Sequence, residues 1–196
     1  MPGEDGRRHT ALLQQPCAQA SALRSGHCPH LSQSDLLRDC TTFDAAPVCA
    51  IYNHYVEQTA VTFEEAPISA AEMARRITEV SSRFPWVVWE RNHTVVGYAY
   101  ATSWKPRSAY RHSVETTIYL SPDAKGQGIG TLLYRALVAR LRSLDVHCAV
   151  GGIALPNPAS VALHEKLGFV NIGQFREIGR KFGRWIDVGY WELRLP

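Results

Sequence analysis

The chain has 196 residues, 45% of them hydrophobic and 20% charged, and a formal net charge of +3. That length favours one globular domain with a sizeable core, and the composition is ordinary for such a domain. No apolar run reaches the roughly 18 residues of a transmembrane helix, and the start lacks an apolar signal core. No stripe of basic and aromatic residues indicates nucleic-acid binding. We therefore expect a cytoplasmic protein with neither a membrane nor a nucleic-acid partner.

The segment 1–34 differs from the rest of the chain. Gly, Pro, Gln and Ser interrupt it without a sustained hydrophobic period, so the sequence predicts a poorly ordered extension over residues 1–34 and a single domain over residues 35–196. The cluster of His27, Cys28 and His30 matches no zinc-ligand spacing, and no second pair of ligands follows it. The five cysteines form no Cys-x-x-Cys pair. We therefore expect a reduced protein without a bound metal.

The predicted elements begin with a strand in LLRDCTT, which starts at Leu36. A helix follows in FDAAPVCAIYNHYVEQ, where the apolar residues have helical spacing. A second helix is predicted in ISAAEMARRITEVSSRF, because Ser69 and Glu72 form a capping box at its start. Two β-rich runs surround residues 91–93 and predict a hairpin, and SVETTIYL predicts another strand.

The second half of the domain alternates helices and strands. A glycine-rich loop leads into an amphipathic helix over residues 132–141, and VHCAVGGIAL predicts a strand. Asn157 and Pro158 begin a short helix that ends at Gly168. The runs VNIGQFREIGRKF and RWIDVGYWELRL predict two final strands. The order β-α-α-β-β-β-α-β-α-β-β indicates a single α/β domain in which helices flank a mixed sheet.

Gly126, Gly128 and Gly130 stand at alternate positions between a predicted strand and a predicted helix. Free amides and the helix dipole at such a place favour an anion such as phosphate. A Walker A loop needs a lysine that is absent here, and a dinucleotide fingerprint needs glycine where Thr131 stands. The loop alone leaves two readings open, the pyrophosphate of coenzyme A and a tight turn without a ligand.

The loop resembles that of the GNAT superfamily of acetyltransferases, [RQ]-x-x-G-x-[GA], with Lys125 in place of the Arg or Gln. A second superfamily motif, N-x-x-[AS]-x-x-x-Y-x-x-x-G-F, is matched from Asn157 to Phe169, except that His164 takes the place of the tyrosine. The runs IYNHYVEQTAVTFEE, WKPRSAY, VETTIYLSP, IALPNPASVALHEKLGF and GRKFGRWIDVGYWELRL resemble the phosphinothricin acetyltransferase family in particular. This resemblance extends over residues 36–195.

The resemblance implies a GNAT-type domain with a mixed, mostly antiparallel sheet, and an N-acetyltransferase that depends on acetyl-CoA. The implied acceptor is the amino group of a small amino acid analogue such as phosphinothricin or methionine sulfoximine or sulfone. Another small amine or an ordinary amino acid remains an alternative, as does an acyl-CoA-binding regulatory module without catalysis. A homodimer is compatible with the sequence.

The resemblance also implies which residues bind acetyl-CoA. Backbone amides at the end of the strand before the loop would meet the acetyl group and the pantetheine arm, and the loop would hold the pyrophosphate. The expected cofactor-binding residues are Ile118, Tyr119, Leu120, Lys125, Gly126, Gln127, Gly128, Ile129, Gly130, Thr131, Asn157 and Ser160.

Two residues are candidates for catalysis. Glu115 lies in an apolar strand, where a carboxylate is costly unless it is paired, solvated or used. The resemblance favours Glu115 as the general base, whereas a solvated residue on a half-exposed strand remains the alternative. For His164 three readings remain open, namely a core histidine, a residue that assists proton removal and a proton donor to sulfur.

Acceptor binding is expected in WKPRSAY, through Lys105, Arg107 and Tyr110. Arginine suits bidentate binding of a carboxylate or phosphinate, and an exposed turn with solvated cations is the alternative. The resemblance adds Phe63 as a wall of the acceptor pocket.

Overall fold

The computed structural model describes residues 35–196 of the chain. The predicted extension and the cluster of His27, Cys28 and His30 lie outside the described residues. Within the described part, no group of three or more metal-ligating side chains comes together. None of the helices described there is long and apolar enough to cross a membrane.

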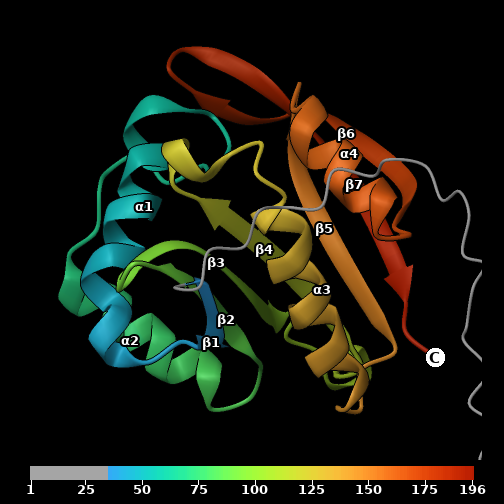
Figure 1. Cartoon of the computed structure of the whole chain (residues 1–196). Coiled ribbons are helices and arrows are strands. Elements are labelled where there is room, and N and C mark those ends of the chain that lie inside the picture. Colours follow the sequence, from blue (N-terminus) through green and yellow to red (C-terminus); the bar gives the residue numbers. More distant parts are fainter. Residues whose placement is uncertain (1–34) are drawn as a thin grey trace, which may run out of the picture.

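The helices and strands follow one another in the predicted order (Figure 1). The strands are β1 (Asp35–Asp39), β2 (Trp86–Arg91), β3 (Thr94–Ser103), β4 (Ser113–Leu120), β5 (Cys148–Leu155), β6 (Val170–Lys181) and β7 (Arg184–Arg194). The helices are α1 (Ala45–Gln58), α2 (Ala70–Ser81), α3 (Ile129–Arg142) and α4 (Pro158–Lys166).

The strands of the described chain form one seven-stranded sheet in the order β1-β2-β3-β4-β5-β7-β6. Every neighbouring pair is antiparallel except β4 and β5, which are parallel. The predicted mixed, mostly antiparallel sheet is therefore confirmed. The parallel pairing joins only residues 113–115 to residues 148–150. Beyond Glu115, β4 stays paired with β3 as far as Leu120 but separates from β5.

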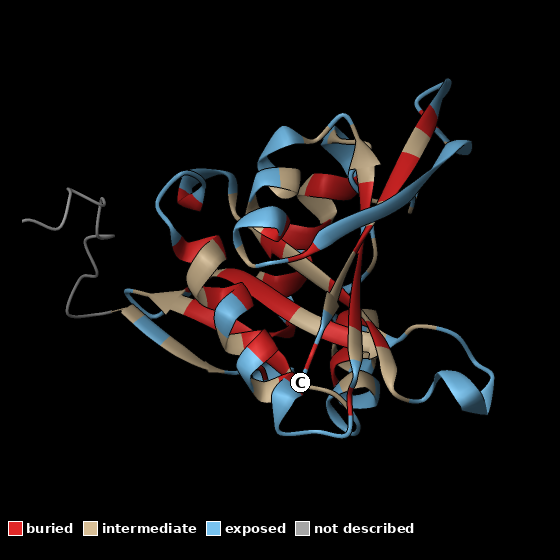
Figure 2. Ribbon diagram, turned by 90° about the vertical axis from the view of Figure 1, so that its right-hand side faces the viewer, coloured by how far each residue is buried: buried red, intermediate tan, exposed pale blue. Residues whose placement is uncertain are grey.

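Helices cover both faces of the sheet. Neighbouring strand residues point to opposite sides, so apolar residues in succession along a strand pack against helices on both faces. Trp86 and Val88 of β2 pack with α1 and α2, whereas Val87 and Trp89 pack with α3. The helix α4 packs on the same face as α3. Buried residues accordingly concentrate in the sheet and on the inner faces of the helices (Figure 2). Each fully buried leucine of α3 contributes about 1.5–3 kcal/mol by burial.

The predicted helix starts agree with the capping contacts. The Ser69 hydroxyl accepts a hydrogen bond from the amide of Glu72 (3.1 Å), and the Asn157 side chain accepts one from the amide of Ser160 (3.2 Å). Asn92 and His93 both have positive φ, 49° and 62°, as a tight turn between two twisted strands requires. These contacts explain why the helix starts and the β2–β3 hairpin were readable from the sequence.

The chain between β1 and α1 is held by Asp44, which is only 5% exposed. Arg38 donates two hydrogen bonds to its carboxylate (2.7 and 2.8 Å), and the amide of Thr41 donates a third (2.8 Å). Burial alone would raise the pKa of Asp44, but the hydrogen bonds from Arg38 and Thr41 outweigh burial, so the pKa is lowered. A lowered pKa in the folded state means that ionised Asp44 stabilises the fold.

Replacing Asp44 with Asn should lower the free energy of unfolding by about 1.5–3 kcal/mol at pH 7, because a hydrogen-bonded charge is lost. The native carboxylate stabilises the fold above its unfolded pKa of about 3.9. Its contribution is lost as the pH falls through the lowered folded pKa, so the two proteins should converge in stability under acid.

Urea denaturation at pH 7 and at acid pH measures this difference. Asp39→Asn is the matched control, because the Asp39 side chain is 76% exposed and pairs with Arg140 at the surface. A difference between Asp44→Asn and the native protein that does not change with pH would contradict the assignment.

Candidate active site

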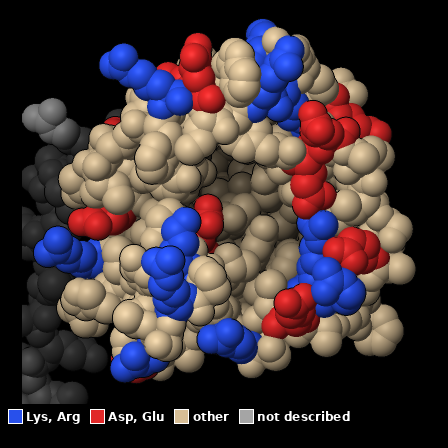
Figure 3. Space-filling view, turned by 180° about the vertical axis from the view of Figure 1, so that it is seen from behind, with Lys and Arg blue, Asp and Glu red and all other residues tan. Residues whose placement is uncertain are grey.

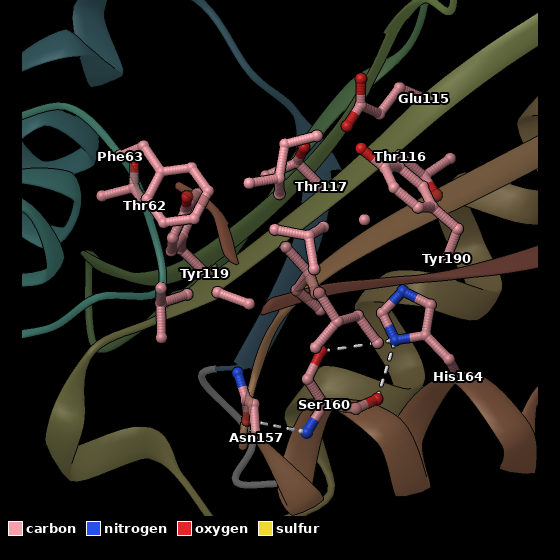
Figure 4. Close-up of a pocket in the computed structure, with 17 residues that line it drawn as sticks. Thr62, Phe63, Glu115, Thr116, Thr117, Tyr119, Asn157, Ser160, His164 and Tyr190 are labelled. Carbon is pink, nitrogen blue, oxygen red and sulfur yellow. Dashed lines mark hydrogen bonds between the residues drawn. The ribbon is translucent and has the colours of Figure 1, made fainter. Parts of the chain in front are cut away.

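A cavity of about 360 Å³ lies where β4 separates from β5. Its walls come from β4, β5, α4, the segment between α1 and α2, and the hairpin of β6 and β7. A hollow with mostly uncharged walls and charged side chains around its rim is visible in Figure 3. The cavity contains seven of the predicted residues, Phe63, Glu115, Ile118, Tyr119, Asn157, Ser160 and His164 (Figure 4).

Two consecutive glycines of β5 make room for the predicted catalytic side chains. A Cβ at Gly151 would lie 2.6 Å from Cδ2 of His164, and a Cβ at Gly152 would lie 3.3 Å from Oε1 of Glu115. Because neighbouring strand residues face opposite sides, one glycine admits the imidazole and the other admits the carboxylate. A Gly-Gly pair inside an apolar strand often marks the close approach of another group, so this signal was present in the sequence but was not used.

Glu115 faces the cavity from β4 and is partly buried (Figure 4). Among the described residues, no side chain forms a hydrogen bond or an ion pair with its carboxylate. Burial raises the pKa of Glu115, and the positive charge of Lys105 opposes part of that rise. Glu115 is thus a partly exposed glutamate on a strand face that borders the cavity. An unengaged carboxylate with a raised pKa is suited to accept a proton.

His164 is 4% exposed, and both of its ring nitrogens are engaged. Nδ1 lies 2.8 Å from the carbonyl oxygen of Ser160, and Nε2 lies 2.9 Å from the hydroxyl of Tyr134. Since a carbonyl oxygen can only accept, we assign the proton to Nδ1, and Nε2 then accepts from Tyr134. Burial lowers the pKa of His164, although the bond to Ser160 opposes this. The lowered pKa favours the neutral imidazole.

A chain of hydroxyls continues from His164 into the sheet. The Tyr134 hydroxyl lies 2.5 Å from Oγ1 of Thr116, which lies 3.2 Å from the carbonyl oxygen of Val150. With neutral His164, Tyr134 donates to Nε2, and Thr116 shares its single hydroxyl proton between the Tyr134 oxygen and the carbonyl oxygen of Val150. If Nε2 gains a proton, both hydroxyls can turn, so that His164 donates to Tyr134, Tyr134 to Thr116, and Thr116 to Val150. The chain thus accommodates both protonation states of the ring.

Tyr134 and Thr116 were missed in the sequence, for a physical reason. Tyr134 lies among the apolar residues of α3, where a tyrosine is typical of a core position. Its ring does stack on Phe169, with the centroids 5.5 Å apart. Only the three-dimensional meeting of α3, α4 and β4 shows that its hydroxyl reaches His164.

The glycine loop lies outside the cavity and presents open backbone amides. Gly126 and Gly128 have φ of 75° and 80°, values that favour glycine. Within the described chain, no backbone or side-chain acceptor takes the amides of residues 126–130. The Gln127 side chain donates to the carbonyl oxygen of Asp123 (2.6 Å) and accepts from Arg91, which fixes the loop from outside. Lys125 and Thr131 flank these amides, so the predicted anion site has the required donors.

The remaining cofactor candidates have structural contacts of their own. Gly130 packs close to Leu120, since a Cβ there would lie 3.4 Å from Cδ1 of Leu120. The carbonyl oxygen of Leu120 accepts a hydrogen bond from the hydroxyl of Tyr55 (2.6 Å). Leu120 does not line the cavity, whereas Ile118 and Tyr119 do. Asn157 and Ser160 line it from the start of α4.

The predicted acceptor residues are separated in the structure. Phe63 lines the cavity, whereas Arg107 and Tyr110 lie exposed in the connection between β3 and β4 and do not. Lys105 is exposed, and its ammonium lies 4.6 Å from the centroid of the Trp104 ring. That ring contacts the cavity residue Tyr190, with the centroids 5.7 Å apart. Lys105 is thus the member of this group whose charge reaches the cavity.

A family model for the acetyltransferase (GNAT) domain matches residues 37–189. The chain belongs to the GNAT acetyltransferase family. The resemblance noted in the sequence is confirmed, because the chain is 40% identical over 156 residues to the phosphinothricin N-acetyltransferase of Streptomyces coelicolor, covering 78% of this chain and 91% of that protein.

Two further GNAT proteins are similar to it. The L-methionine sulfoximine/L-methionine sulfone acetyltransferase of Pseudomonas aeruginosa is 35% identical, with 81% of this chain and 94% of that protein covered. The structure of a phosphinothricin acetyltransferase from Sinorhizobium meliloti in complex with acetyl-CoA superimposes with a TM-score of 0.80. It is 39% identical, with 83% of this chain and 89% of that chain covered.

The proton assignment for His164 predicts a distinct NMR signature. In ¹⁵N-labelled protein at pH 7, the ring should be neutral with its proton on Nδ1, because Nε2 is held as an acceptor by Tyr134. Tyr134→Phe should stay folded, since the stacked ring is kept, and should shift the Nε2 resonance. His164→Gln identifies the signal. A proton on Nε2 in the neutral ring, or a cationic ring at pH 7, would show that the assignment is wrong.

Proposed function

We propose that the protein transfers the acetyl group of acetyl-CoA to the amino group of a small amino acid analogue such as phosphinothricin or methionine sulfoximine or sulfone. One observation carries the proposal, namely that Glu115 and His164 line a single cavity at the separation of β4 and β5. The names of the relatives from Streptomyces coelicolor and Pseudomonas aeruginosa support the acceptor class.

The residues that would hold acetyl-CoA fit its chemistry. The open amides of residues 126–130 suit a pyrophosphate, and the following helix α3 adds its dipole. Past Glu115, the edge of β4 that faces the cavity has no strand partner, so its peptide groups can meet the amide groups of a pantetheine arm. Acetyl-CoA bound in this way would supply an activated acetyl group beside Ile118 and Tyr119. The S. meliloti structure, which is in complex with acetyl-CoA, supports acetyl-CoA as the co-substrate.

Glu115 is the proposed general base. The amino group of a free amino acid is mostly protonated at pH 7 and must lose a proton before it attacks. Burial raises the pKa of Glu115 and so brings its basicity closer to that of the proton donor. The carboxylate can take the proton directly or through a water molecule.

The geometry of His164 supports an indirect role. Its two nitrogens already contact Ser160 and Tyr134, so neither is free to meet the acceptor. The neutral ring holds its one proton against a carbonyl oxygen, which makes it a poor donor to sulfur. We infer that His164 shapes the cavity beside Ser160 and that its hydroxyl chain buffers charge that develops there.

The acceptor end of the cavity has apolar walls. Phe63, Ile178 and Val188 contribute to it, and none of the lysines or arginines of residues 35–196 lines it. Lys105, Arg107 and Tyr110 remain the proposed clamp for an acidic group, and the charge of Lys105 acts on Glu115. Because the cavity itself lacks a cation, an ordinary amino acid with an apolar side chain is the second candidate acceptor.

The acceptor is tested by thiol release from acetyl-CoA with phosphinothricin, methionine sulfone, methionine and a simple alkylamine. A clamp for the polar group should give the first two a kcat/KM at least about tenfold above that of methionine, the value of one charged hydrogen bond. Equal values for methionine would favour the second candidate. Binding of acetyl-CoA without thiol release for any amine would mean that the protein is a non-catalytic module.

Glu115→Gln should lower kcat by about 10²–10⁴-fold at pH 7, because a positioned base is lost while the shape is kept. Acetyl-CoA affinity measured by calorimetry should hardly change. The defect should shrink as the pH rises, since more of the acceptor then arrives deprotonated.

Glu165→Gln, on the exposed side of α4, is the matched control. His164→Ala should not show this recovery at high pH. Recovery in His164→Ala and its absence in Glu115→Gln would transfer the base role to His164.

A further inference from the structure

The hairpin between β6 and β7 extends beyond the sheet (Figure 1), and Ile178, Val188 and Tyr190 from these strands line the cavity. Its strand β6 is bent by a register shift between Phe175 and Gly179, and Glu177 there has φ of 49°. The Asp187 carboxylate holds the bend, because it accepts hydrogen bonds from the amide of Glu177 (2.8 Å) and the side chain of Gln174 (2.6 Å). The direction of the hairpin is therefore fixed by contacts within the hairpin itself.

Opposite the hairpin lies loop 59–66, the first part of the connection between α1 and α2, which contributes Phe63 to the cavity. It has supports of its own. The hydroxyl of Tyr52 on α1 lies 3.0 Å from Oγ1 of Thr62, and Arg76 on α2 forms a salt bridge with Glu64 (2.7 Å). The hairpin and loop 59–66 are thus two arms that are anchored on different helices and strands.

Lys181 joins the two arms. Its ammonium donates a hydrogen bond to the carbonyl oxygen of Thr62 (2.8 Å), across 119 positions of sequence. Lys181 is only 2% exposed, which is rare for a lysine and costly without compensation. Burial lowers the pKa of Lys181, and the carboxylates of Glu65 and Glu64 oppose part of that change. None of the chemical steps proposed above uses this buried cation.

A second contact lies beside the first. The Phe63 ring occupies the space above Gly179, where a Cβ would lie 2.6 Å from Cε2 of the ring. Gly179 and Lys181 are two residues apart on β6 and so project to the same side, and Thr62 and Phe63 are adjacent in the loop. The hydrogen bond from Lys181 to Thr62 therefore fixes the backbone beside Phe63, and the lack of a side chain at Gly179 leaves the space that the Phe63 ring fills.

We propose that Lys181 is a positioning residue for the acceptor, which holds the Thr62 carbonyl and thereby keeps Phe63 against Gly179 as a wall of the cavity. This role rests on the proposed function, because it concerns the acceptor of the same site. Lys181 does not itself line the cavity, so it acts through Phe63.

Lys181→Met keeps the length of the side chain and removes the donor. The KM for the preferred acceptor should rise about tenfold, the effect of one charged hydrogen bond, while the KM for acetyl-CoA stays within about twofold. Arg180→Met is the matched control, since Arg180 is the neighbouring residue, is exposed and contacts Trp185. Its acceptor KM should be native. An equal rise of both KM values in Lys181→Met would overturn the proposal.

A double-mutant cycle with Phe63→Ala tests the route of the effect. If Lys181 acts through Phe63, adding Lys181→Met to Phe63→Ala should change the acceptor KM by less than about twofold. Independent effects that multiply would show that Lys181 serves the fold in general and not the wall. Lys181→Arg, which keeps the charge and can donate, should restore much of the acceptor affinity in the presence of Phe63.

Hydrogen exchange separates this proposal from the proposed function, because it needs no turnover. Lys181→Met should accelerate amide exchange in loop 59–66 by about tenfold and leave α2 unchanged, since the lost bond is local. Arg180→Met should exchange as the native protein does. Absence of turnover in the native protein with any amine would defeat the proposed function alone, whereas unchanged exchange in loop 59–66 would defeat the role of Lys181.

Discussion

The parallel pairing of β4 with β5 ends after residues 113–115, and the candidate site depends on that early end. A backbone edge that is buried without partners is costly, so an open edge of this kind needs polar groups or a ligand beside it. On the β4 side, the hydroxyl of Tyr55 satisfies the carbonyl of Leu120. Where β4 and β5 begin to separate, the Thr116 hydroxyl donates to the carbonyl oxygen of Val150. The backbone amide and carbonyl groups between Thr116 and Leu120 on this edge are left for a bound ligand.

Burial then acts on two ionisable groups in opposite senses. It raises the pKa of Glu115 and lowers that of His164, because in both cases it disfavours the charged form. What distinguishes the two residues is hydrogen bonding. The imidazole is engaged at both nitrogens, whereas the carboxylate has no partner among the described residues. The division of roles proposed for Glu115 and His164 rests on this difference in hydrogen bonding more than on either pKa.

Most of the fold was readable from the sequence, because local signals reported it. The capping residues Ser69 and Asn157 and the turn at Asn92 each act within a few residues of the chain, and all appear in the structure as expected. Glu115, His164 and Phe63 were predicted as site residues from motifs shared with a family, and the structure brings them into one cavity.

The residues that were missed act over long distances in the sequence. Tyr134 reads as a core residue of α3, and Lys181 reads as one more surface cation on a basic hairpin, until the packing of distant segments reveals their partners. The placement of Arg107 and Tyr110 outside the cavity is equally invisible in a run of residues, because it depends on how the connection between β3 and β4 projects from the sheet.

The strand order β5-β7-β6 has a consequence for biosynthesis. Of the strands in this sheet, β7 is synthesised last, and it lies between two strands that precede it in the sequence. Until β7 is complete, β6 has no neighbour to pair with and the wall formed by Val188 and Tyr190 does not exist. Contacts between distant parts of a chain also form slowly. A chain without β7 therefore leaves the backbone edge of β5 unpaired, and the site forms only when β7 is inserted.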